Sequence, residues 1–424
     1  MVQSKIESTL WHKRQNCRLC GSDHLKEVIN LPPMPVATPN FRVRGVSSDH
    51  PIYREPVPMP LHICNKCGFL QIIYVGNADI QYRDYMYTTS LSLGLPQHFI
   101  DSASHLIAKV QLEKGKHIVE FGSNDGTYLR AFKAEGMEVT GIDPARVIAE
   151  NATKSGITTY PEFFDEKLAH TIRNEVGAAD LIVANNVIAN IDDFAGVFKA
   201  AKILLSEQGS FVFETQYGLD VTENYLLDTI YHEHLSYVNI APLVRVLPTY
   251  GLEVYDVEHV NTKGGSIRVF VALIESKHPI SENVAKFVKL EDDTACETQE
   301  YFNTFGAGIK AIKETVNQIV DEARARGEKV AGYGVSVGTT TMLGQLGLSQ
   351  KIDFLIDDDP EKPKALYGPN YDIPVCPKDQ LIAQNVKLVV SFAWRYTDAI
   401  KANNPHYVEN GGKFLIPLPQ PKLT

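Results

Sequence analysis

The sequence lacks any long hydrophobic run. No stretch of about 20 apolar residues, the length that a helix needs to cross a bilayer, occurs in the chain. The opening segment, MVQSKIESTLWHKRQN, has no apolar core of the kind found in a secretory signal peptide. We therefore expect a cytoplasmic protein with no membrane partner.

An excess of positive charge is also lacking. The chain has 41 Lys and Arg against 51 Asp and Glu, which gives a formal net charge of −10, and no basic run offsets it. Proteins that bind nucleic acid through its phosphates need a basic surface, so we expect no nucleic-acid partner. A small anionic substrate remains compatible with this charge, because it needs only a local cationic or amide-rich pocket.

Internal repeats and low-complexity tails are absent as well. The composition, with 44% hydrophobic and 22% charged residues, is that of a globular protein. Because 424 residues are too many for one ordinary core, we expect two or three domains.

Cysteine is scarce, with six in the chain, but four of them form two close pairs in CRLCGS and CNKCGF. A disulfide framework does not suit the cytoplasm, whereas CxxC followed by glycine forms a tight turn that directs two thiolates at one ion. The gap of about forty residues between the pairs is longer than in most zinc ribbons. We expect Cys17, Cys20, Cys64 and Cys67 to hold a structural zinc ion, because four protein ligands leave no coordination position open.

Apolar strands alternate with helical periods from about residue 80 to 275. HIVEFGS, EVTGID, DLIVANN and GSFVFETQ are typical of buried strands, and DGTYLRAFKAEG and DDFAGVFKAAKILLSEQ are typical of helices between them. This alternation predicts an α/β fold with a doubly wound parallel sheet. GLEVYDVEHV and GSIRVFVALI predict a hairpin-like addition at one sheet edge, and amphipathic helices over about 280–326 precede a second α/β block.

The turn after the first strand, in VEFGSNDGTYL, has the features of a ligand-binding loop. Gly122 and Gly126 let the backbone approach a ligand, and Asp143 ends the next strand where it can hold a ribose diol. Glu120 and Asp125 would repel phosphates, which disfavours NAD and favours S-adenosylmethionine (SAM), a cationic ligand without phosphate. The expected cofactor-binding residues are Glu120, Gly122, Asn124, Asp125, Gly126, Asp143 and Asn185.

The segment DTIYHEHLSYV follows the strand GSFVFETQ within about twenty residues that we expect to be irregular. Ligands of doubly wound sheets bind at the C-terminal strand ends, so this excursion places Tyr231, His232, Glu233 and His234 near the methyl group of SAM. Packing of single members against the N-terminal region is an alternative for each of them. A second metal site is disfavoured, because the two histidines lack the i, i+4 spacing of zinc proteases.

These motifs together resemble the sugar-nucleotide C-methyltransferases of deoxysugar biosynthesis. The resemblance covers nearly the whole chain, through CRLCGS and CNKCG, EFGSNDGTYL, YHEHLSY, KGGSIRV and GYGVSVGTTT. It implies a class I methyltransferase-like sheet flanked by an N-terminal zinc-binding module and a C-terminal Rossmann-like domain. We place the boundaries at 1–78, 79–276 and 277–424.

The resemblance also implies a reaction, methylation of C3 of a nucleotide-linked 4-keto-6-deoxy sugar. His234 would remove the C3 proton, which the neighbouring ketone acidifies, and a base with a pKa near neutral suits this task. Tyr231 and Glu233 would position the sugar and the imidazole, and Tyr85 would line the pocket. The expected partner is a nucleotide-diphosphate sugar, with dTDP favoured and GDP or CDP as alternatives, and the expected state is a monomer or weak oligomer.

The sequence departs from the family pattern in three places. Asn190 stands where the family usually has a histidine that contacts the substrate, and GVSVGTTT replaces GASAKGNT, so the lysine of that loop is missing. DDDPEKPKALYGPN differs from a basic, glycine-containing version. The C-terminal domain and the turn around Gly264 would hold the nucleotide diphosphate, so these changes bear on the substrate more than on methyl transfer.

Three alternatives remain at this point. An NAD-dependent sugar-nucleotide oxidoreductase would use GYGVSVG, with Gly332, Gly334 and Gly338, and Asp357 on the ribose. A SAM methyltransferase acting on a different acceptor is the second. The third is a zinc-module protein that binds RNA or protein and keeps the methyltransferase domain as a scaffold.

Overall fold

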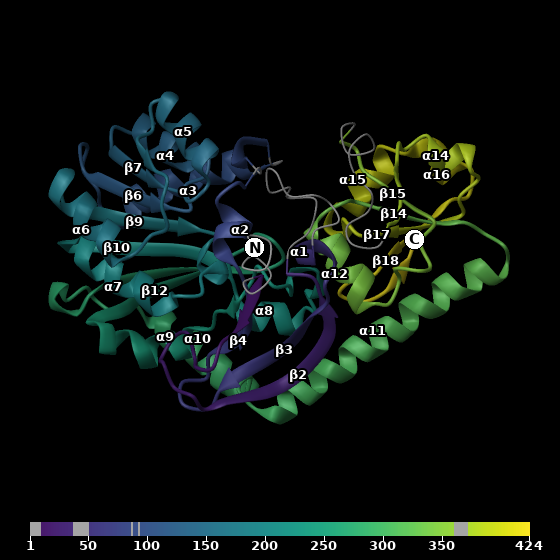
Figure 1. The fold of residues 1–424 in the computed structure, drawn as a ribbon, viewed down its shortest axis with the longest axis horizontal. Coiled ribbons are helices and arrows are strands. Elements are labelled where there is room, and N and C mark those ends of the chain that lie inside the picture. Colours follow the sequence, from purple (N-terminus) through teal and green to yellow (C-terminus); the bar gives the residue numbers. More distant parts are fainter. Residues whose placement is uncertain (1–9, 37–50, 86–87, 92–93, 360–371) are drawn as a thin grey trace, which may run out of the picture.

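The computed structural model describes residues 10–36, 51–85, 88–91, 94–359 and 372–424. Three main sheets and one two-stranded sheet organise this part of the chain (Figure 1). Each main sheet takes its strands from one stretch of sequence, with one strand as the exception. The proposed boundaries 1–78, 79–276 and 277–424 remain predictions. Most of DDDPEKPKALYGPN, from Pro360 on, lies outside the described residues.

The central sheet has seven strands in the order β12-β13-β10-β9-β6-β7-β8. Strands β10, β9, β6, β7 and β8 run parallel, and β13 pairs antiparallel with both β10 and β12. The predicted doubly wound sheet and its antiparallel edge addition are therefore confirmed. The strands are β6 (His117–Phe121), β7 (Glu138–Ile142), β8 (Thr159–Tyr160), β9 (Ala179–Asn185), β10 (Leu205–Gln216), β12 (Leu252–Val260) and β13 (Ser266–Leu273).

Helices cover both faces of this sheet because alternate strand residues point to opposite sides. On β6, Ile118 packs with α3 (Leu95–Lys109) and α4 (Thr127–Ala134), whereas Val119 packs on the other face with α6 (Glu166–Glu175) and α7 (Phe194–Leu204). A short helix, α5 (Arg146–Lys154), follows β7. The helix expected over DDFAGVFKAAKILLSEQ is shorter than predicted, because β10 already begins at Leu205.

The N-terminal part forms a four-stranded antiparallel sheet in the order β11-β4-β3-β2. Its strands are β2 (Leu25–Met34), β3 (Val57–Cys64), β4 (Leu70–Ile72) and β11 (Ser236–Tyr237), and β1 (Trp11–Lys13) pairs separately with β5 (Tyr74–Gly76). Strand β11 is the exception in sequence order. It directly follows the YHEH segment, so this segment is tied to the N-terminal sheet.

The excursion after β10 is more ordered than the sequence predicted. It contains α8 (Gly218–Glu223), the 3₁₀ turn η5 (Leu227–Thr229) and β11, followed by α9 (Ile240–Val246) and η6 (Leu247–Tyr250). The sequence did not reveal these elements because packing against both neighbouring units stabilises them, and local helix or strand propensity does not show such contacts.

The C-terminal sheet has the order β16-β15-β14-β17-β18-β19, parallel except for β19. Its strands are β14 (Val330–Tyr333), β15 (Phe354–Ile356), β16 (Val375–Cys376), β17 (Leu388–Ser391), β18 (Lys413–Ile416) and β19 (Lys422–Leu423). Its helices are α12 (Val337–Gln345), α14 (Gln380–Ala383), α15 (Thr397–Ala402) and α16 (Pro405–Glu409). This is the predicted Rossmann-like domain.

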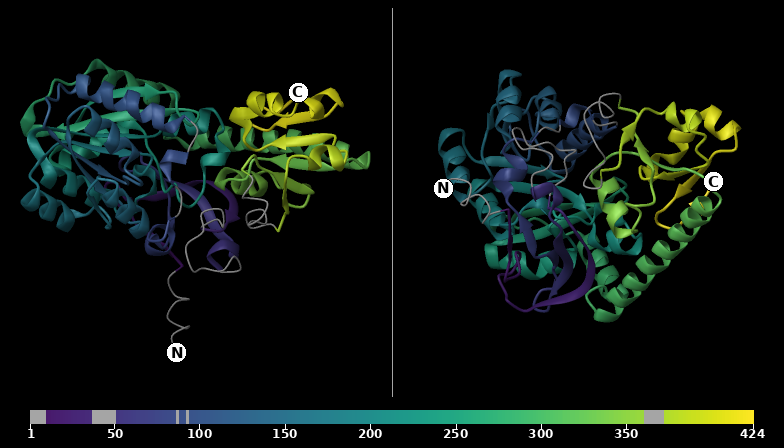
Figure 2. Two further views of the ribbon diagram at one scale, coloured as in Figure 1. Left: turned by 90° about the horizontal axis from the view of Figure 1, so that it is seen from above. Right: turned by 45° about the vertical axis from the view of Figure 1, so that its right-hand side comes forward.

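Two helices, α10 (Glu282–Thr294) and α11 (Gln299–Ala325), connect the two larger sheets. The long α11 runs along the N-terminal sheet toward the C-terminal domain, and the further views show the N-terminal sheet where the two larger units meet (Figure 2). One apolar core joins all three parts here, with Leu61 of β3, Phe305 of α11 and Leu343 of α12. The N-terminal module therefore packs between the two domains. Among the described residues, no helix is both long and apolar enough to cross a membrane.

Candidate active site and zinc centre

The four predicted zinc ligands come together in one cluster. The Sγ atoms of Cys17 and Cys67 lie 3.7 Å apart, those of Cys20 and Cys64 lie 3.6 Å apart, and all four sulfurs fall within 4.8 Å of one another. A tetrahedral zinc ion with Zn–S bonds of about 2.3 Å spaces its sulfurs by about 3.8 Å, so the cluster fits zinc. It is the only group of this kind within the described ranges.

Two glycines shape the turns that carry these thiols. Gly21 and Gly68 adopt φ values of 72° and 81°, a left-handed conformation that residues with a Cβ rarely adopt. The amide of Gly21 donates to the carbonyl of Cys17, and that of Gly68 to the carbonyl of Cys64. A Cβ at Gly68 would also collide with the Glu297 carboxyl group.

The zinc centre is closed and packs against the central domain. Cys17, Cys64 and Cys67 are buried, and the ring of Phe69 packs against that of Phe194 on α7 at 5.3 Å. The Tyr250 hydroxyl donates to the carbonyl of Leu19 at 2.7 Å. With four protein ligands and these contacts, the centre is structural.

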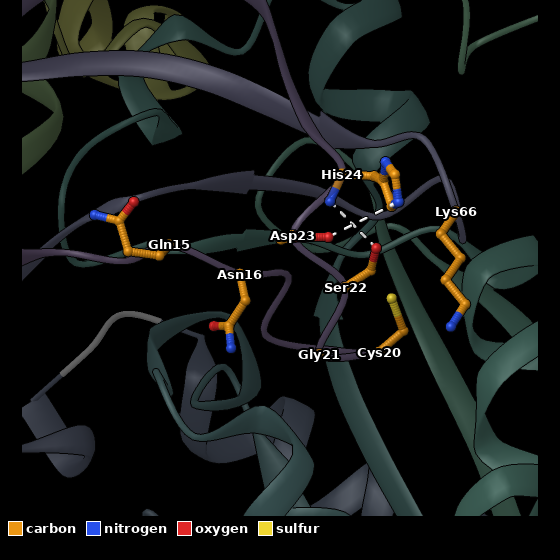
Figure 3. A pocket seen from close by; sticks show the side chains of 8 residues that line it. All are labelled: Gln15, Asn16, Cys20, Gly21, Ser22, Asp23, His24 and Lys66. Carbon is orange, nitrogen blue, oxygen red and sulfur yellow. Dashed lines mark hydrogen bonds and ion pairs between the residues drawn. The ribbon is translucent and has the colours of Figure 1, made fainter.

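An open, polar cavity of about 740 Å³ lies on the outer side of the zinc-binding turns (Figure 3). It contains none of the predicted catalytic or SAM-binding residues, and Cys20 is the only zinc ligand that reaches it. Its lining residues are Gln15, Asn16, Cys20, Gly21, Ser22, Asp23, His24 and Lys66.

A second cavity, of about 590 Å³, lies at the C-terminal ends of β6, β7 and β9. The YHEH segment and the first residue of α12, Val337, close it from the other side. Ten of the predicted site residues line this cavity, and they are Tyr85, Glu120, Gly122, Asn124, Asp143, Asn185, Asn190, Tyr231, Glu233 and His234.

The β6 end of the cavity is built by a braced loop. Asp143 accepts hydrogen bonds from the backbone amides of Asn124, at 2.8 Å, and Ala145, at 2.9 Å. Gly122 and Asn124 have positive φ values of 69° and 49°, and a Cβ at Gly122 would lie 2.8 Å from Val187. This bracing fixes the loop in a strained path that keeps its backbone open to a ligand.

The charge at this end suits SAM. Burial raises the pKa of Glu120 well above its usual range, and burial raises the pKa of Asp143 to about 6. Oε2 of Glu120 is buried without a hydrogen-bond partner in the described part of the chain. Glu120 is neutral in the free protein and can ionise beside a bound cation, so it fits the ammonium or sulfonium group of SAM.

Two predicted cofactor residues do not line the cavity. Asp125 accepts hydrogen bonds from the amides of Ser90 and Thr127, and Gly126 is the residue before α4, with a φ of 77°. Asp125 and Gly126 therefore stabilise the loop without lining the cavity.

His234 and Tyr231 form a hydrogen-bonded pair in the cavity. Nδ1 of His234 lies 2.8 Å from the carbonyl oxygen of Thr229, and Nε2 lies 3.0 Å from the Tyr231 hydroxyl. A carbonyl oxygen only accepts, so Nδ1 carries the proton and Nε2 accepts from Tyr231. Burial and, to a smaller extent, the charge of Lys263 lower the pKa of His234 to about 4, below the near-neutral value expected for the base, so the imidazole is neutral at pH 7.

Glu233 and Asn190 add acceptors beside this pair. Burial raises the pKa of Glu233 to about 7, and no group in the described part of the chain hydrogen-bonds to its carboxyl. Asn190 donates to the Tyr82 hydroxyl at 3.4 Å, while its Oδ1 has no partner among the described residues. The cavity therefore offers acceptors to a ligand that carries hydroxyl or amino groups.

His232 does not belong to the cavity, contrary to its expected place near the methyl group. Its Nδ1 lies 3.2 Å from the carbonyl oxygen of Tyr74, and its Nε2 lies 3.3 Å from that of Val57. Burial lowers its pKa, so the ring is neutral and donates to only one of these two carbonyls, a bond that joins the segment to the N-terminal module. His232 and Glu233 are the central residues of a turn, which the amide of His234 closes by donating to the carbonyl of Tyr231 at 2.9 Å, and this turn separates His232 from its neighbours.

Sequence reasoning missed Tyr82, Asp192 and Lys263, which also line the cavity. Lys263 has a positive φ of 52° in the turn between β12 and β13, and no other residue of the described chain pairs with its side chain. The motif KGGSIRV was the available signal for Lys263. No sequence motif pointed to Asp192, because its role depends on arginines from the zinc module.

The C-terminal domain meets the segment at Asp228. The Asp228 carboxylate accepts from Nη1 of Arg395 at 2.5 Å and from the indole of Trp394 at 3.2 Å. In the predicted alternative dinucleotide loop, Asp357 accepts from the amide of Val335 and so braces the loop.

Three family models match the chain in order. They are described as a zinc binding domain (residues 17–82), a methyltransferase domain (residues 96–257) and a C-methyltransferase C-terminal domain (residues 261–419). C-methyltransferase NovU of Streptomyces niveus is 28% identical over 408 residues, which cover 96% of each chain. These matches confirm the resemblance to C-methyltransferases that carry a zinc-binding domain.

Some solved methyltransferase structures align with part of this chain. The magnesium protoporphyrin IX methyltransferase ChlM of Synechocystis, with bound SAH, is 14% identical and covers 42% of this chain and 83% of its own, with a TM-score of 0.33. A SAM-dependent methyltransferase of Clostridium acetobutylicum is 13% identical over 42% of this chain and 91% of its own, also with a TM-score of 0.33.

Removal of one zinc ligand should impair folding more than it impairs catalysis. We expect Cys17→Ser to lower zinc content and soluble yield, because a closed four-cysteine site contributes folding free energy. Metal analysis of the purified protein and its thermal unfolding measure this, and Cys376→Ser, a cysteine outside the cluster, is the control. A soluble, zinc-free and active Cys17→Ser protein would contradict the structural assignment.

Proposed function

We propose that this chain, a SAM-dependent C-methyltransferase with a zinc-binding domain, methylates C3 of a nucleotide-linked 4-keto-6-deoxy sugar. The observation that carries the proposal is the shared cavity, in which the SAM loop and a neutral histidine face the same space. Carbon methylation needs a base beside the methyl donor, since the acceptor carbon must first become a nucleophile.

The proposed base is Nε2 of His234. With Nδ1 donating to the carbonyl of Thr229, Nε2 holds the lone pair that accepts the C3 proton. The C3–H electrons then form a C3–C4 double bond, and the C4 oxygen becomes an enolate. Burial keeps the imidazole neutral at working pH, so no prior deprotonation is needed.

Bound SAM supplies the methyl group as a sulfonium electrophile. Glu120 and Asp143 are the proposed partners of its cationic part and its ribose, together with the loop residues Gly122 and Asn124 and with Asn185 at the strand end. Asp125 and Gly126 act by holding that loop. The protein contributes alignment and exclusion of water, which account for much of the rate when the electrophile is already reactive.

Tyr231, Tyr85, Glu233 and Asn190 are proposed to hold the sugar. The Tyr231 hydroxyl donates to Nε2 of His234 in the free protein and would turn to the sugar when Nε2 accepts the C3 proton. Glu233 and Asn190 line the same cavity, and Oδ1 of Asn190 has no partner among the described residues. Asn190 cannot take up a proton and become cationic, so its role is limited to hydrogen bonding.

The nucleotide diphosphate is proposed to lie between the central and C-terminal domains. Lys263 lies on this side of the cavity, its ammonium group has no hydrogen bond or ion pair among the described residues, and the turn at Gly264 and Gly265 follows it, both with positive φ values. This supports an anionic group near the turn despite the acidic net charge. A dTDP sugar is favoured, GDP or CDP are the alternatives, and a cytoplasmic monomer or weak oligomer is expected.

Labelled SAM offered with dTDP-, GDP- and CDP-4-keto-6-deoxyhexoses tests the proposal, with products identified by mass spectrometry. We expect one nucleotide sugar to gain a single methyl group at C3. If SAM binds but no sugar is methylated, the acceptor is a different molecule.

Replacement of the proposed base should separate chemistry from binding. We expect His234→Asn to lower kcat by at least about 100-fold, within the usual range for loss of a general base, while SAM affinity stays near wild type. His232→Asn, which alters a histidine outside the cavity, controls for effects on folding. Substantial turnover by His234→Asn would rule out His234 as the base.

SAM affinity should depend on pH through Asp143. Its pKa of about 6 means that the carboxylate is largely protonated at pH 5 and ionised at pH 7.5. An ionised carboxylate accepts hydrogen bonds more strongly, so we expect the SAM Kd to rise by up to about tenfold as the pH falls from 7.5 to 5. Calorimetric titration of wild type and Asp143→Asn checks this, and the variant should lose most of the dependence near pH 6. An equal wild-type Kd at both pH values would argue against this role.

A further inference from the structure

We propose that Arg18, inside the first zinc-binding turn, is a positioning residue for the methyl-transfer reaction, because its guanidinium holds the backbone next to His234. This inference rests on the proposed function for the identity of the reaction. The hydrogen bond from Arg18 to the carbonyl of Leu235 is present in the protein without SAM or sugar. The zinc module then has a part in the geometry of the active site as well as in folding.

The side chain of Arg18 is fully buried and spans three parts of the molecule. Nη1 donates to the carbonyl oxygen of Leu235 at 2.7 Å, and Nη2 donates to that of Ile72 at 2.8 Å. Nη2 also lies 3.3 Å from Oδ1 of Asp192. One guanidinium therefore joins the zinc-binding turn to β4, to the YHEH segment and to the cavity wall.

Leu235 is the residue after His234, so its position fixes one end of the catalytic segment. Its amide donates to the carbonyl of Ala189 at 2.7 Å, and its carbonyl accepts from the amide of Ile72 at 2.9 Å as well as from Arg18. Only one peptide bond separates this anchor from His234. A shift of Leu235 would move the imidazole with it.

Asp192 extends the same network to the cavity, which it lines beside Asn190. Its carboxylate faces Arg14 at 2.9 Å and Arg18 at 3.3 Å, and His12 lies 3.3 Å away. The Arg14 side chain is partly exposed and, among the described residues, hydrogen-bonds only to Asp192 and to the carbonyl of Asn16. The two arginines thus share one carboxylate, and only Arg18 reaches the catalytic segment.

Stability alone is a poor explanation for this arrangement. Burying a guanidinium carries a large desolvation penalty, and apolar residues of similar size often stabilise a fold equally well. Nε of Arg18 has no hydrogen-bond partner among the described residues, which adds to that cost. A planar group with several fixed donors is, however, well suited to hold two carbonyls and a carboxylate in one geometry.

The zinc ligands on either side of Arg18 determine where the guanidinium projects from. Cys17 precedes it and Cys20 follows two residues later, so the ion's ligands fix the backbone at both ends of this short turn. Without this constraint, the long side chain of Arg18 would start from a mobile backbone and would reach its three acceptors less often. Rotamer entropy would oppose that arrangement.

Comparison of Arg18→Met with Arg14→Met tests the inference. We expect Arg18→Met to lower kcat by about 100-fold, the cost of a displacement near 1 Å, while KM values and the SAM Kd change by less than about threefold. Its zinc content should equal that of wild type, and amide hydrogen exchange over residues 231–237 should accelerate. Arg14→Met should resemble wild type in kcat and in amide exchange.

Amide exchange needs no sugar, so it decides the structural claim even if the proposed acceptor is wrong. Equal kcat and equal exchange in the two variants would overturn the inference. Parallel loss of zinc, SAM binding and activity in Arg18→Met would also overturn it, because that pattern indicates a folding role alone. If Arg18→Met is insoluble, Arg18→Lys, which keeps the charge but not the fork of donors, is judged by the same criteria.

Discussion

The hydrogen bond from Nδ1 of His234 to the carbonyl of Thr229 is the interaction on which the rest of the active site depends. It leaves the lone pair on Nε2, and it works only while the backbone on both sides is held in place. The C-terminal domain holds one side through Asp228 and Arg395, and the zinc module holds the other through Arg18 and Leu235. The three parts of the chain thus meet at one short segment.

The central and C-terminal domains brace the loop after their first strand in the same way. In each, an aspartate at the end of the second strand accepts from a backbone amide of the loop after the first strand, Asp143 from Asn124 and Asp357 from Val335. The central loop lines a cavity with the buried carboxyl of Glu120, whose Oε2 has no partner within the described ranges, and this suits a cation. The same scaffold therefore gives different binding chemistry according to the side chains around it.

Much of the fold was predictable, because strands such as β6 and β9 are short apolar runs whose period and spacing identify them. The zinc ligands were predictable from their spacing. Other features were not, since they arise from contacts between distant segments. The separation of His232 from His234, the ordered structure around η5 and the buried place of Arg18 all depend on how the N-terminal sheet docks.

The most direct test of the account is the exchange of the C3 proton of a 4-keto-6-deoxy nucleotide sugar with deuterated water, measured by NMR with SAH in place of SAM. The account predicts that wild-type protein exchanges this proton without methyl transfer and that His234→Asn does not. Exchange at the wild-type rate in His234→Asn would contradict it, as would methylation by a wild-type protein that shows no exchange at C3.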